Sequence, residues 1–251
     1  MTATPAIAPY LMLLIHGESK TGKTSLLATA PKPLLVLDSE AGGMRFIDER
    51  IIQWDPSLES IPEGAGTDWD VCRVRVRRAS DLDAAYRAVS QAEHPFKSIG
   101  IDSITEFQAR LKRDIDPDGK IDMQGWGTML AKMEDVVWGF QDMVEHPRWP
   151  IKVFAVIAGT RMRDAKYRPY LQGQTVTQMP YKVDICGFLT TTTDEEQNTR
   201  RALMIRGSDI HDIGERVHGI NGLTPAGNHL NDIVWDPNIK TIFEQIHGEE
   251  A

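Results

Sequence analysis

A glycine- and lysine-containing stretch near the N-terminus constrains the fold of this chain more than any other feature. Residues 17–24 read GESKTGKT and fit the pattern G-x-x-x-x-G-K-[ST] of a phosphate-binding loop. The apolar run LMLLIH at residues 11–16 predicts a buried strand before the loop, and residues 25–28 predict the first turns of a helix after it. The motif requires this strand–loop–helix context. A glycine-rich turn that binds nothing is the alternative interpretation.

The residue types in this loop suit a nucleoside triphosphate. Gly17 and Gly22 permit backbone conformations and close approaches that a Cβ atom would block. Successive N–H groups then point inward around an anion, and the following helix adds its positive end. Lys23 is expected to reach the β- and γ-phosphates, and the Thr24 hydroxyl is expected to bind Mg²⁺. The predicted nucleotide-binding residues are Gly17, Glu18, Ser19, Lys20, Thr21, Gly22, Lys23, Thr24 and Ser25.

The bulk composition excludes several classes of protein. A length of 251 residues suits one large α/β domain, or one domain with a small appendage. The formal net charge of −8 argues against coating of nucleic acid through bulk charge, but it is compatible with a local basic groove. The isolated Cys72 and Cys186 indicate reduced thiols in a cytoplasm. The apolar run at 153–159 is far too short to span a membrane, so no membrane partner is expected.

Strand and helix patterns alternate after the loop. The expected strands cover residues 34–37, 71–76, 98–101 and 151–158, and the expected helices begin near residues 80, 105 and 128. The stretch 44–69 is expected to be mostly irregular. Two apolar runs at 185–192 and 202–205 are separated by a polar turn and predict an antiparallel hairpin. The pattern therefore predicts an α/β fold, a mainly parallel twisted sheet flanked by helices, with a C-terminal antiparallel hairpin.

Composition also suggests where the chain divides. Residues 1–9 hold prolines among small residues and are expected to form a flexible N-terminal arm. The α/β core is expected at residues 10–225. Residues 226–251 are expected to form a C-terminal extension with a short helix and an acidic tail.

An aspartate-rich stretch at residues 114–125 partly matches a calcium-binding loop. Asp114, Asp116 and Asp118 occupy its first, third and fifth positions. The twelfth position is Gly125, however, where a bidentate glutamate is required. A solvated turn is therefore the favoured interpretation, and ion binding by this loop is left open.

Two acidic residues are expected beside the phosphate-binding loop, because ligands of such sheets sit at the C-terminal ends of the strands. Asp102 follows the apolar run 98–101 and is predicted to hold Mg²⁺ with Thr24, with capping of the next helix as the alternative. Glu40 follows the second strand, where a carboxylate can orient the water that attacks the γ-phosphate. A plain surface residue is the alternative for Glu40. The predicted catalytic residues are Glu40 and Lys23.

The segment from residue 159 to 182 differs from the rest of the chain in charge. Tyrosines alternate there with basic residues, and Asp164 is its single acidic residue: the basic residues are Arg161, Arg163, Lys166, Arg168 and Lys182. Cations that neutralise phosphates, together with aromatic faces that stack on bases, are typical of single-strand binding. A solvated loop whose charges serve solubility is the alternative.

The order of these motifs resembles that of RecA-like recombination ATPases. The phosphate-binding loop, LLVLDSE, IGIDS and VIAGTRMR follow one another as in that family, over about residues 10–225. The resemblance implies a RecA-like P-loop NTPase core in which Glu40 is catalytic and Asp102 is the Walker B aspartate. It also implies a DNA-contacting loop with Arg161 and Arg163, which Lys166 and Arg168 extend. The short length looks most like the small RecA-like proteins of phages, described as P-loop nucleotide-binding proteins or as single-strand annealing proteins of the fourth Sak class.

The chain departs from the family pattern at two functions. RecA-like proteins usually carry Gln or His at the end of the fifth strand as a γ-phosphate sensor, and here only Thr160 offers a comparable hydrogen bond. The family also often reaches into a neighbouring subunit's nucleotide with a basic residue from its late loops. Arg206 and Arg216 are the candidates for such a trans-acting finger.

The resemblance implies a function that can be stated concretely. The chain is expected to bind ATP and to hydrolyse it slowly with Mg²⁺, and DNA is expected to stimulate this hydrolysis. It is expected to form a ring or filament on single-stranded DNA and to promote annealing or strand exchange in phage recombination, in the host cytoplasm. A single-strand-binding protein is a further expected partner. Two alternatives stay open: a small-molecule kinase, whose lid would use Arg161, Arg163 and Arg168, and a nucleotide-gated module such as a helicase loader.

Overall fold

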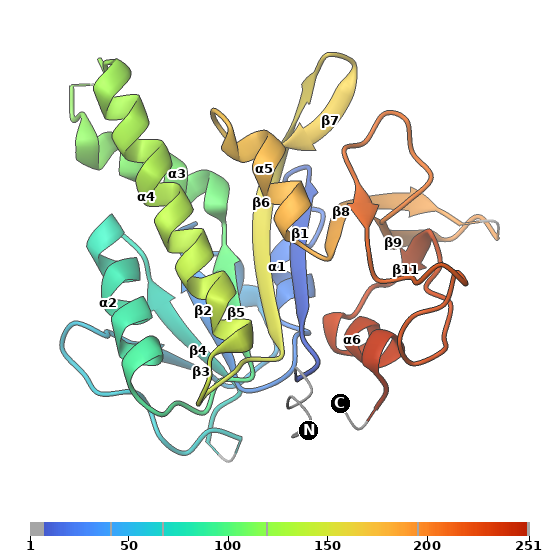
Figure 1. Cartoon of the computed structure of the whole chain (residues 1–251), viewed down its shortest axis with the longest axis horizontal. Helices are drawn as coiled ribbons and strands as arrows, with labels where there is room; N and C mark the ends of the chain where they lie inside the picture. Colours follow the sequence, from blue (N-terminus) through green and yellow to red (C-terminus); the bar gives the residue numbers. More distant parts are fainter. Residues whose placement is uncertain (1–7, 41, 67, 119, 195, 250–251) are drawn as a thin grey trace, which may run out of the picture.

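The computed structural model describes residues 8–249 apart from residues 41, 67, 119 and 195. Its centre is a mixed sheet with the strand order β11-β9-β8-β1-β6-β5-β2-β4-β3 (Figure 1). Neighbouring strands run parallel from β3 through to β8, and antiparallel pairing begins between β8 and β9. The bounds are β1 (Leu11–Gly17), β2 (Leu34–Asp38), β3 (Ile51–Trp54), β4 (Val71–Arg75), β5 (Ser98–Asp102), β6 (Val153–Arg163), β7 (Lys166–Pro169), β8 (Ile185–Thr193), β9 (Thr199–Met204), β10 (Gly214–Glu215) and β11 (Ile233–Trp235).

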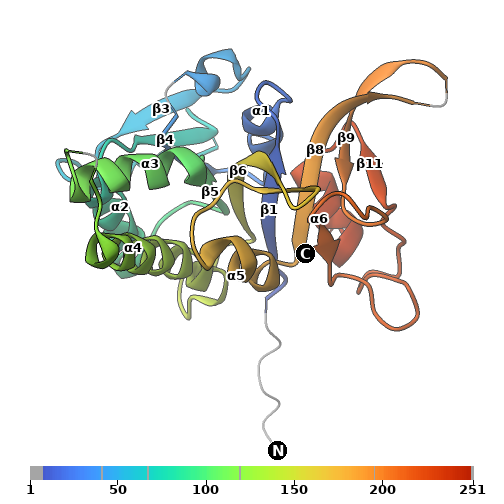
Figure 2. The ribbon, with the colours of Figure 1, turned by 90° about the horizontal axis from the view of Figure 1, so that it is seen from above.

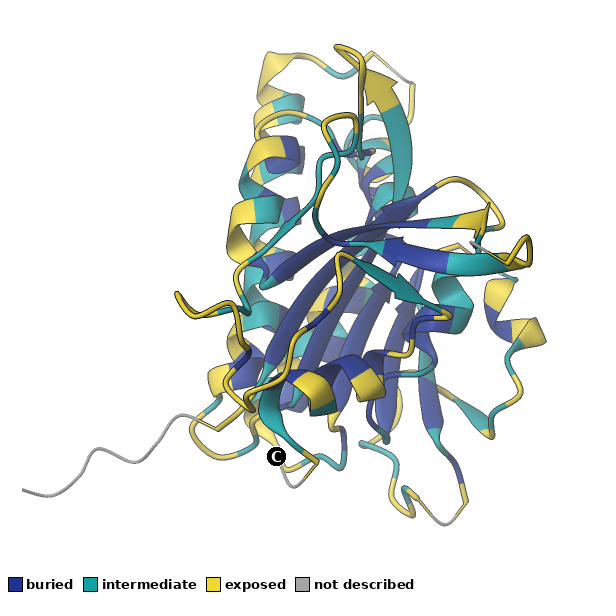
Figure 3. Cartoon of the chain, turned by 90° about the vertical axis from the view of Figure 1, so that its right-hand side faces the viewer, coloured by how far each residue is buried: buried dark blue, intermediate teal, exposed yellow. Residues whose placement is uncertain are grey.

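Helices cover both faces of this sheet (Figure 2). They are α1 (Lys23–Leu27), α2 (Ala79–Gln91), α3 (Ile104–Ile115), α4 (Met123–Gln141), α5 (Thr175–Lys182) and α6 (Ile239–His247), with the 3-10 turns η1 (Gly43–Phe46) and η2 (Asp142–Glu145). Along β1, Met12 and Leu14 pack in the cluster that holds α2 to α5, whereas Leu13 and Ile15 pack in the cluster that holds α1 and α6. Because both faces are covered, the strands read as continuous apolar runs rather than as alternating ones. Figure 3 shows the central strands buried along most of their length.

The structure confirms the fold class expected from the sequence. The sheet is mainly parallel with helices on both faces, and β8 and β9 form the expected C-terminal antiparallel hairpin. β3 and β6 differ from expectation. β3 forms inside the stretch expected to be irregular, because Trp54 and Trp69 bury their rings against Phe96 at centroid distances of 6.1 and 5.9 Å. β6 continues to Arg163, because β7 pairs antiparallel with its far end.

The aspartate-rich stretch connects two helices. α3 ends at Ile115, and the side chain of Asp122 accepts a hydrogen bond of 2.8 Å from the Gly125 amide at the start of α4. Asp122 is therefore an N-cap. Across the described part of the chain, we find no group of three or more His, Cys, Asp and Glu side chains arranged to hold a metal ion.

The ends of the chain bear on the expected division into parts. The N-terminal arm falls largely on residues 1–7, and the acidic tail ends in residues 250–251, all outside the described residues. α6 buries Ile242 and Phe243 in the same cluster as Leu13 of β1. The division into a core at 10–225 and an extension at 226–251 stays a proposal. No helix within the described residues is both long enough and apolar enough to cross a membrane.

Candidate nucleotide-binding site

The phosphate-binding loop joins β1 to α1 and lines a cavity of about 810 Å³. Eight of the nine predicted loop residues line it: Gly17, Glu18, Ser19, Lys20, Gly22, Lys23, Thr24 and Ser25. Thr21 instead donates from Oγ1 to the Glu18 carbonyl oxygen at 3.0 Å, within the loop itself. Glu40, Asp102, Thr160 and Arg161 line the same cavity. These residues converge because β1, β2, β5 and β6 run parallel, so their C-terminal ends meet at one edge.

The loop backbone is shaped to approach a ligand closely. Gly22 has φ 89°, in the left-handed region that glycine adopts without strain. Gly17 needs to be glycine for a different reason, because a Cβ atom there would collide with the backbone carbonyl of Leu189. Both glycines of the motif are therefore demanded by the structure.

Lys23 lies folded back into the loop. Its Nζ donates to the Gly17 carbonyl oxygen at 3.0 Å and to the Glu18 carbonyl oxygen. Burial lowers the pKa of Lys23, and the negative charges of Glu40, Asp102 and Glu18 oppose that shift. A partly desolvated ammonium gains from an anionic partner, so this position suits a lysine that binds phosphate.

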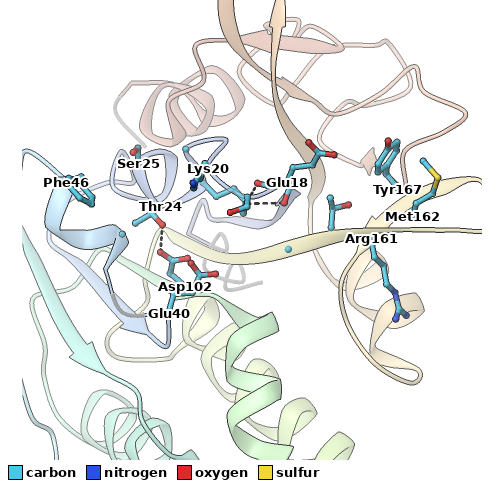
Figure 4. Close-up of a pocket in the computed structure, with 17 residues that line it drawn as sticks. Glu18, Lys20, Thr24, Ser25, Glu40, Phe46, Asp102, Arg161, Met162 and Tyr167 are labelled. Atoms are coloured by element: carbon cyan, nitrogen blue, oxygen red, sulfur yellow. Dashed lines mark hydrogen bonds between the residues drawn. The ribbon is translucent and has the colours of Figure 1, made fainter.

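Thr24 and Asp102 form the part of the site that fits a metal ion. The Thr24 hydroxyl donates to Asp102 Oδ2 at 2.7 Å (Figure 4). Asp102 is 2% exposed, and burial, with help from Glu40 and Asp38, raises its pKa to about 7. Its other oxygen, Oδ1, is buried without a hydrogen-bond partner among the described residues. A hydroxyl next to a carboxylate that lacks compensation is a donor set of hard oxygens, which suits Mg²⁺.

Glu40 lies beside Asp102 at the cavity wall (Figure 4). The buried Ser103 donates from Oγ to Glu40 Oε1 at 2.7 Å, and this bond fixes the direction of the carboxylate. The other carboxylate at this edge, Asp38, is occupied by ion pairs with Arg73 and Arg75. Glu40 is thus a carboxylate in the cavity whose second oxygen can accept a proton from water.

Thr160 is placed where β6 passes the cavity, and it has two partners. Its Oγ1 lies 3.1 Å from the Arg168 carbonyl oxygen and 3.2 Å from Nδ1 of His16. His16 is fully buried, and burial lowers its pKa to about 4, so the ring is neutral. Its Nε2 lies 3.1 Å from the Asp212 carbonyl oxygen, which only accepts, so Nε2 carries the single proton. Nδ1 and the Arg168 carbonyl therefore compete for the one hydroxyl proton of Thr160.

The four residues predicted to bind DNA lie on the hairpin of β6 and β7. Arg161 pairs with Arg168 across the hairpin, and Arg163 pairs with Lys166. Directly opposed residues share a face, so all four cations lie on one side of the hairpin. Arg161 lies over the Tyr170 ring at 5.3 Å and points away from the Thr24–Asp102 pair (Figure 4). Arg161 therefore lines the cavity together with Glu40 and Asp102 but directs its guanidinium away from these carboxylates.

The two arginines predicted to act in trans are held within their own chain. Arg206 forms ion pairs with Asp232 at 2.9 Å and Glu215 at 3.3 Å. Arg216 pairs with Asp184 at 2.9 Å. Neither lines the cavity. A role in trans would require these pairs to break.

One residue at the loop was missed in the sequence. Arg201 of β9 packs on Gly22, and a Cβ atom built on Gly22 would lie 3.1 Å from Nη1 of Arg201. Arg201 is far from the loop in sequence, and no motif surrounds it. Only the strand order, which places β9 two strands from β1, brings it there.

Comparison with known proteins places the chain in a family. Over residues 10–217 it matches the model of a family described as AAA domain. A search of curated protein sequences gives no match. Among solved structures, it is similar to the flagellar accessory protein FlaH of Methanocaldococcus jannaschii, at 12% identity and a TM-score of 0.45, with 92% of this chain and 88% of that chain covered. It is also similar to an ATPase from the type III secretion system of pathogenic bacteria, at 15% identity and a TM-score of 0.42, with 72% of this chain and 52% of that chain covered.

The match to the family rests on more than half of the chain and includes every cavity residue named above. The two solved structures are too distant to carry an argument about this site. The phosphate-binding loop, the carboxylate at the end of β5 and the parallel sheet agree with the family match. The chain therefore belongs to the family of AAA domains and is an AAA-type P-loop NTPase domain.

Proposed function

We propose that this protein binds ATP with Mg²⁺ and hydrolyses it. The observation that carries the proposal is the convergence of Lys23, the Thr24–Asp102 pair and Glu40 on one cavity. P-loop NTPases use these groups to bind phosphates, to hold a metal ion and to orient the attacking water. A magnesium ion bound at Thr24 and Asp102 supplies positive charge that stabilises the phosphate oxygens.

The chain's own residues account for the remaining work. The loop amides and Lys23 orient the triphosphate, with its terminal phosphate toward Glu40 and Thr160. Glu40, aimed by Ser103, accepts a hydrogen bond from the attacking water and takes its proton as the new P–O bond forms. The bond between the γ-phosphorus and the bridging oxygen breaks in the same displacement, and ADP leaves with that electron pair. Thr160 offers its hydroxyl proton to a γ-phosphate oxygen, in place of the bonds it makes to the chain itself.

We propose single-stranded DNA as the polymer partner of the β6–β7 hairpin. Like charges directly opposed across strands are unfavourable for folding, and Asp164 forms ion pairs with only two of the four cations, Arg163 and Arg168. A polyanion relieves that repulsion by neutralising the cations and releasing its counterions. The exposed Tyr170, beneath Arg161, offers a ring on which a base can stack.

The remaining functional proposals rest on the resemblance to small RecA-like phage proteins. They are assembly as a ring or filament in the cytoplasm, annealing or strand exchange during recombination, and cooperation with a single-strand-binding protein. These proposals depend on nucleotide binding and on DNA binding, so those two properties are tested first.

The proposal is tested by measuring phosphate release from ATP with and without single-stranded DNA, with Mg²⁺ or EDTA, for wild type and Lys23→Ala. We expect Mg²⁺-dependent turnover, stimulation by DNA, and loss of at least ~100-fold in the variant, whose triphosphate loses its main cation. Turnover that is indifferent to DNA but rises with a small-molecule acceptor would establish the kinase alternative. ATP binding without turnover would favour the helicase-loader alternative.

A further inference from the structure

We propose that Arg201 is a phosphate-binding residue of the same protomer, completing the nucleotide site from the side opposite Glu40 and Asp102. This inference rests on the proposed nucleotide-binding function and extends it to a residue outside the motif. In the sheet, β9 lies on one side of β1, whereas β5 and β2, which deliver Asp102 and Glu40, lie on the other side. Arg201 and the two carboxylates therefore approach the loop from opposite sides.

Arg201 occupies the space beside Gly22 of the phosphate-binding loop. A phosphate-binding loop carries glycine at this position so that phosphate can approach the backbone without meeting a Cβ atom. In this structure, the side chain nearest to the position of that missing Cβ is Arg201. Its Nη1 would lie 3.1 Å, and its Cδ 3.3 Å, from a Cβ on Gly22. The guanidinium thus lies against the loop backbone at Gly22, next to the Gly22 and Lys23 amides on which the proposed phosphate would bind.

Arg201 differs from its neighbour Arg200 in the contacts that its guanidinium makes. Arg200 and Arg201 are adjacent on β9, so their side chains point to opposite faces. Arg200 pairs with Asp236 at 2.7 Å and with Asp194 at 3.4 Å, and it lies 5.6 Å from the centre of the Trp235 ring. Among the described residues, no hydrogen bond or ion pair holds the Arg201 guanidinium. Its five donors stay available for an anion.

The guanidinium group is well suited to binding phosphate. Its planar fork matches two phosphate oxygens at once, and such charge-assisted bonds are among the strong ones. The β8–β9 hairpin holds Arg201 at the loop through antiparallel pairing of Thr191 with Arg201. The residue is therefore delivered by a rigid element rather than by a mobile loop. With Lys23, it makes a second cation for the phosphate chain from within one protomer.

The experiment measures ADP and inorganic pyrophosphate binding by calorimetry, with Mg²⁺, for wild type and variants. Arg201→Ala and Arg201→Gln should each weaken both ligands by about 10- to 100-fold, as expected when a hydrogen bond to a charged group is lost. Arg200→Ala, which removes the same charge from the next position, should bind both ligands as the wild type does. Thermal unfolding without ligand, measured for each variant, separates loss of binding from loss of folding.

The outcomes are distinct. Unchanged affinity for both ligands in Arg201→Gln, or equal losses in the Arg200 and Arg201 variants, would overturn the inference. A loss for ADP with none for pyrophosphate would also overturn it, since the contact would then be to the nucleoside. Full rescue by Gln of a loss seen with Ala would indicate packing on Gly22 instead of charge. If wild type binds neither ligand, or Lys23→Ala binds as wild type does, the proposed nucleotide function itself fails.

Discussion

The phosphate cavity and the basic hairpin both carry charged side chains, but they hold them in different ways. In the cavity, two hydrogen bonds fix the direction of the carboxylates: Thr24 donates to Asp102, and Ser103 donates to Glu40. On the hairpin, Arg163 and Lys166 are exposed and oppose each other across the strands. A preorganised group can stabilise one defined geometry, whereas an exposed cation contributes charge with little directional preference. The difference supports the proposed chemistry in the cavity and the proposed polymer binding on the hairpin.

The largest expected effect is on phosphate release, from a substitution that changes the cavity and leaves the hairpin intact. Glu40→Gln keeps an oxygen for the hydrogen bond from Ser103 but removes the group that takes the proton from water. We expect phosphate release to fall by about 100-fold or more, with ADP affinity and DNA affinity unchanged. Steady-state turnover and calorimetry of the same preparations measure both properties.

The control for this substitution is Glu106→Gln, which changes the same residue type at the start of α3, outside the cavity. It should turn over ATP at the wild-type rate. If Glu40→Gln retains turnover within about twofold of wild type, Glu40 is a surface residue and the water is oriented by another group.

The sequence was sufficient for the groups whose placement follows from a local rule. The phosphate-binding loop is a contiguous motif, and Asp102 follows an apolar run that ends at the ligand edge of a parallel sheet. The strand β3 was missed because its few apolar residues lie among prolines and glycines, and its burial depends on Phe96 from another segment.

Contacts that depend on the order and register of strands were beyond the reach of the sequence. His16 meets Thr160 although 144 residues separate them, and Arg201 reaches Gly22 only because β8 lies between β9 and β1. The four hairpin cations could be counted in the sequence, but their common face depends on the β6–β7 pairing. Charge is readable from composition, whereas the direction in which a charge points requires the fold.

A second substitution should break the hairpin and leave the cavity intact. Replacing Arg161 and Arg163 by Ala should weaken binding to single-stranded DNA by about 10-fold near 0.1 M salt. It should also reduce the slope of log affinity against log salt concentration by about 1–2, because fewer counterions are released. ADP affinity should not change. Fluorescence anisotropy with a labelled oligonucleotide over a salt series provides the measurement.

A matched control for the hairpin removes the same charge elsewhere. Arg87 on α2 and Arg113 on α3 are exposed, and their double replacement by Ala lowers the net charge equally. If this control weakens DNA binding as much as the hairpin variant does, the effect is one of bulk charge and the hairpin is an ordinary solvated segment.

A third expected effect concerns His16, the residue that joins the two regions, and it is measured on stability instead of on turnover or binding. Through Thr160 it contacts the cavity, and through the same hydroxyl it competes with the Arg168 carbonyl of the hairpin. Burial, with smaller contributions from His211 and Lys23, lowers the His16 pKa from 6.5 to about 4. The unfolded chain therefore binds a proton at His16 between pH 6.5 and 4 that the folded chain does not, so stability is full above pH 6.5 and falls as the pH decreases through this window.

We expect His16 to remove about 2 kcal/mol of unfolding free energy between pH 7 and pH 5, on the scale of one pKa unit per 1.36 kcal/mol. Other histidines with lowered pKa, such as His211, contribute to the wild-type curve, so the test is a difference. Urea unfolding of wild type and His16→Gln across this range should give a shallower dependence in the variant, whatever its stability at pH 7. Parallel curves would show that folding leaves the pKa of His16 unshifted, which would contradict the buried, neutral ring described above. The ATP turnover of His16→Gln, compared with and without DNA, would also show whether the Thr160 hydroxyl couples the cavity to the hairpin. Without the imidazole of His16, the Thr160 hydroxyl proton no longer has a competing acceptor to the Arg168 carbonyl oxygen.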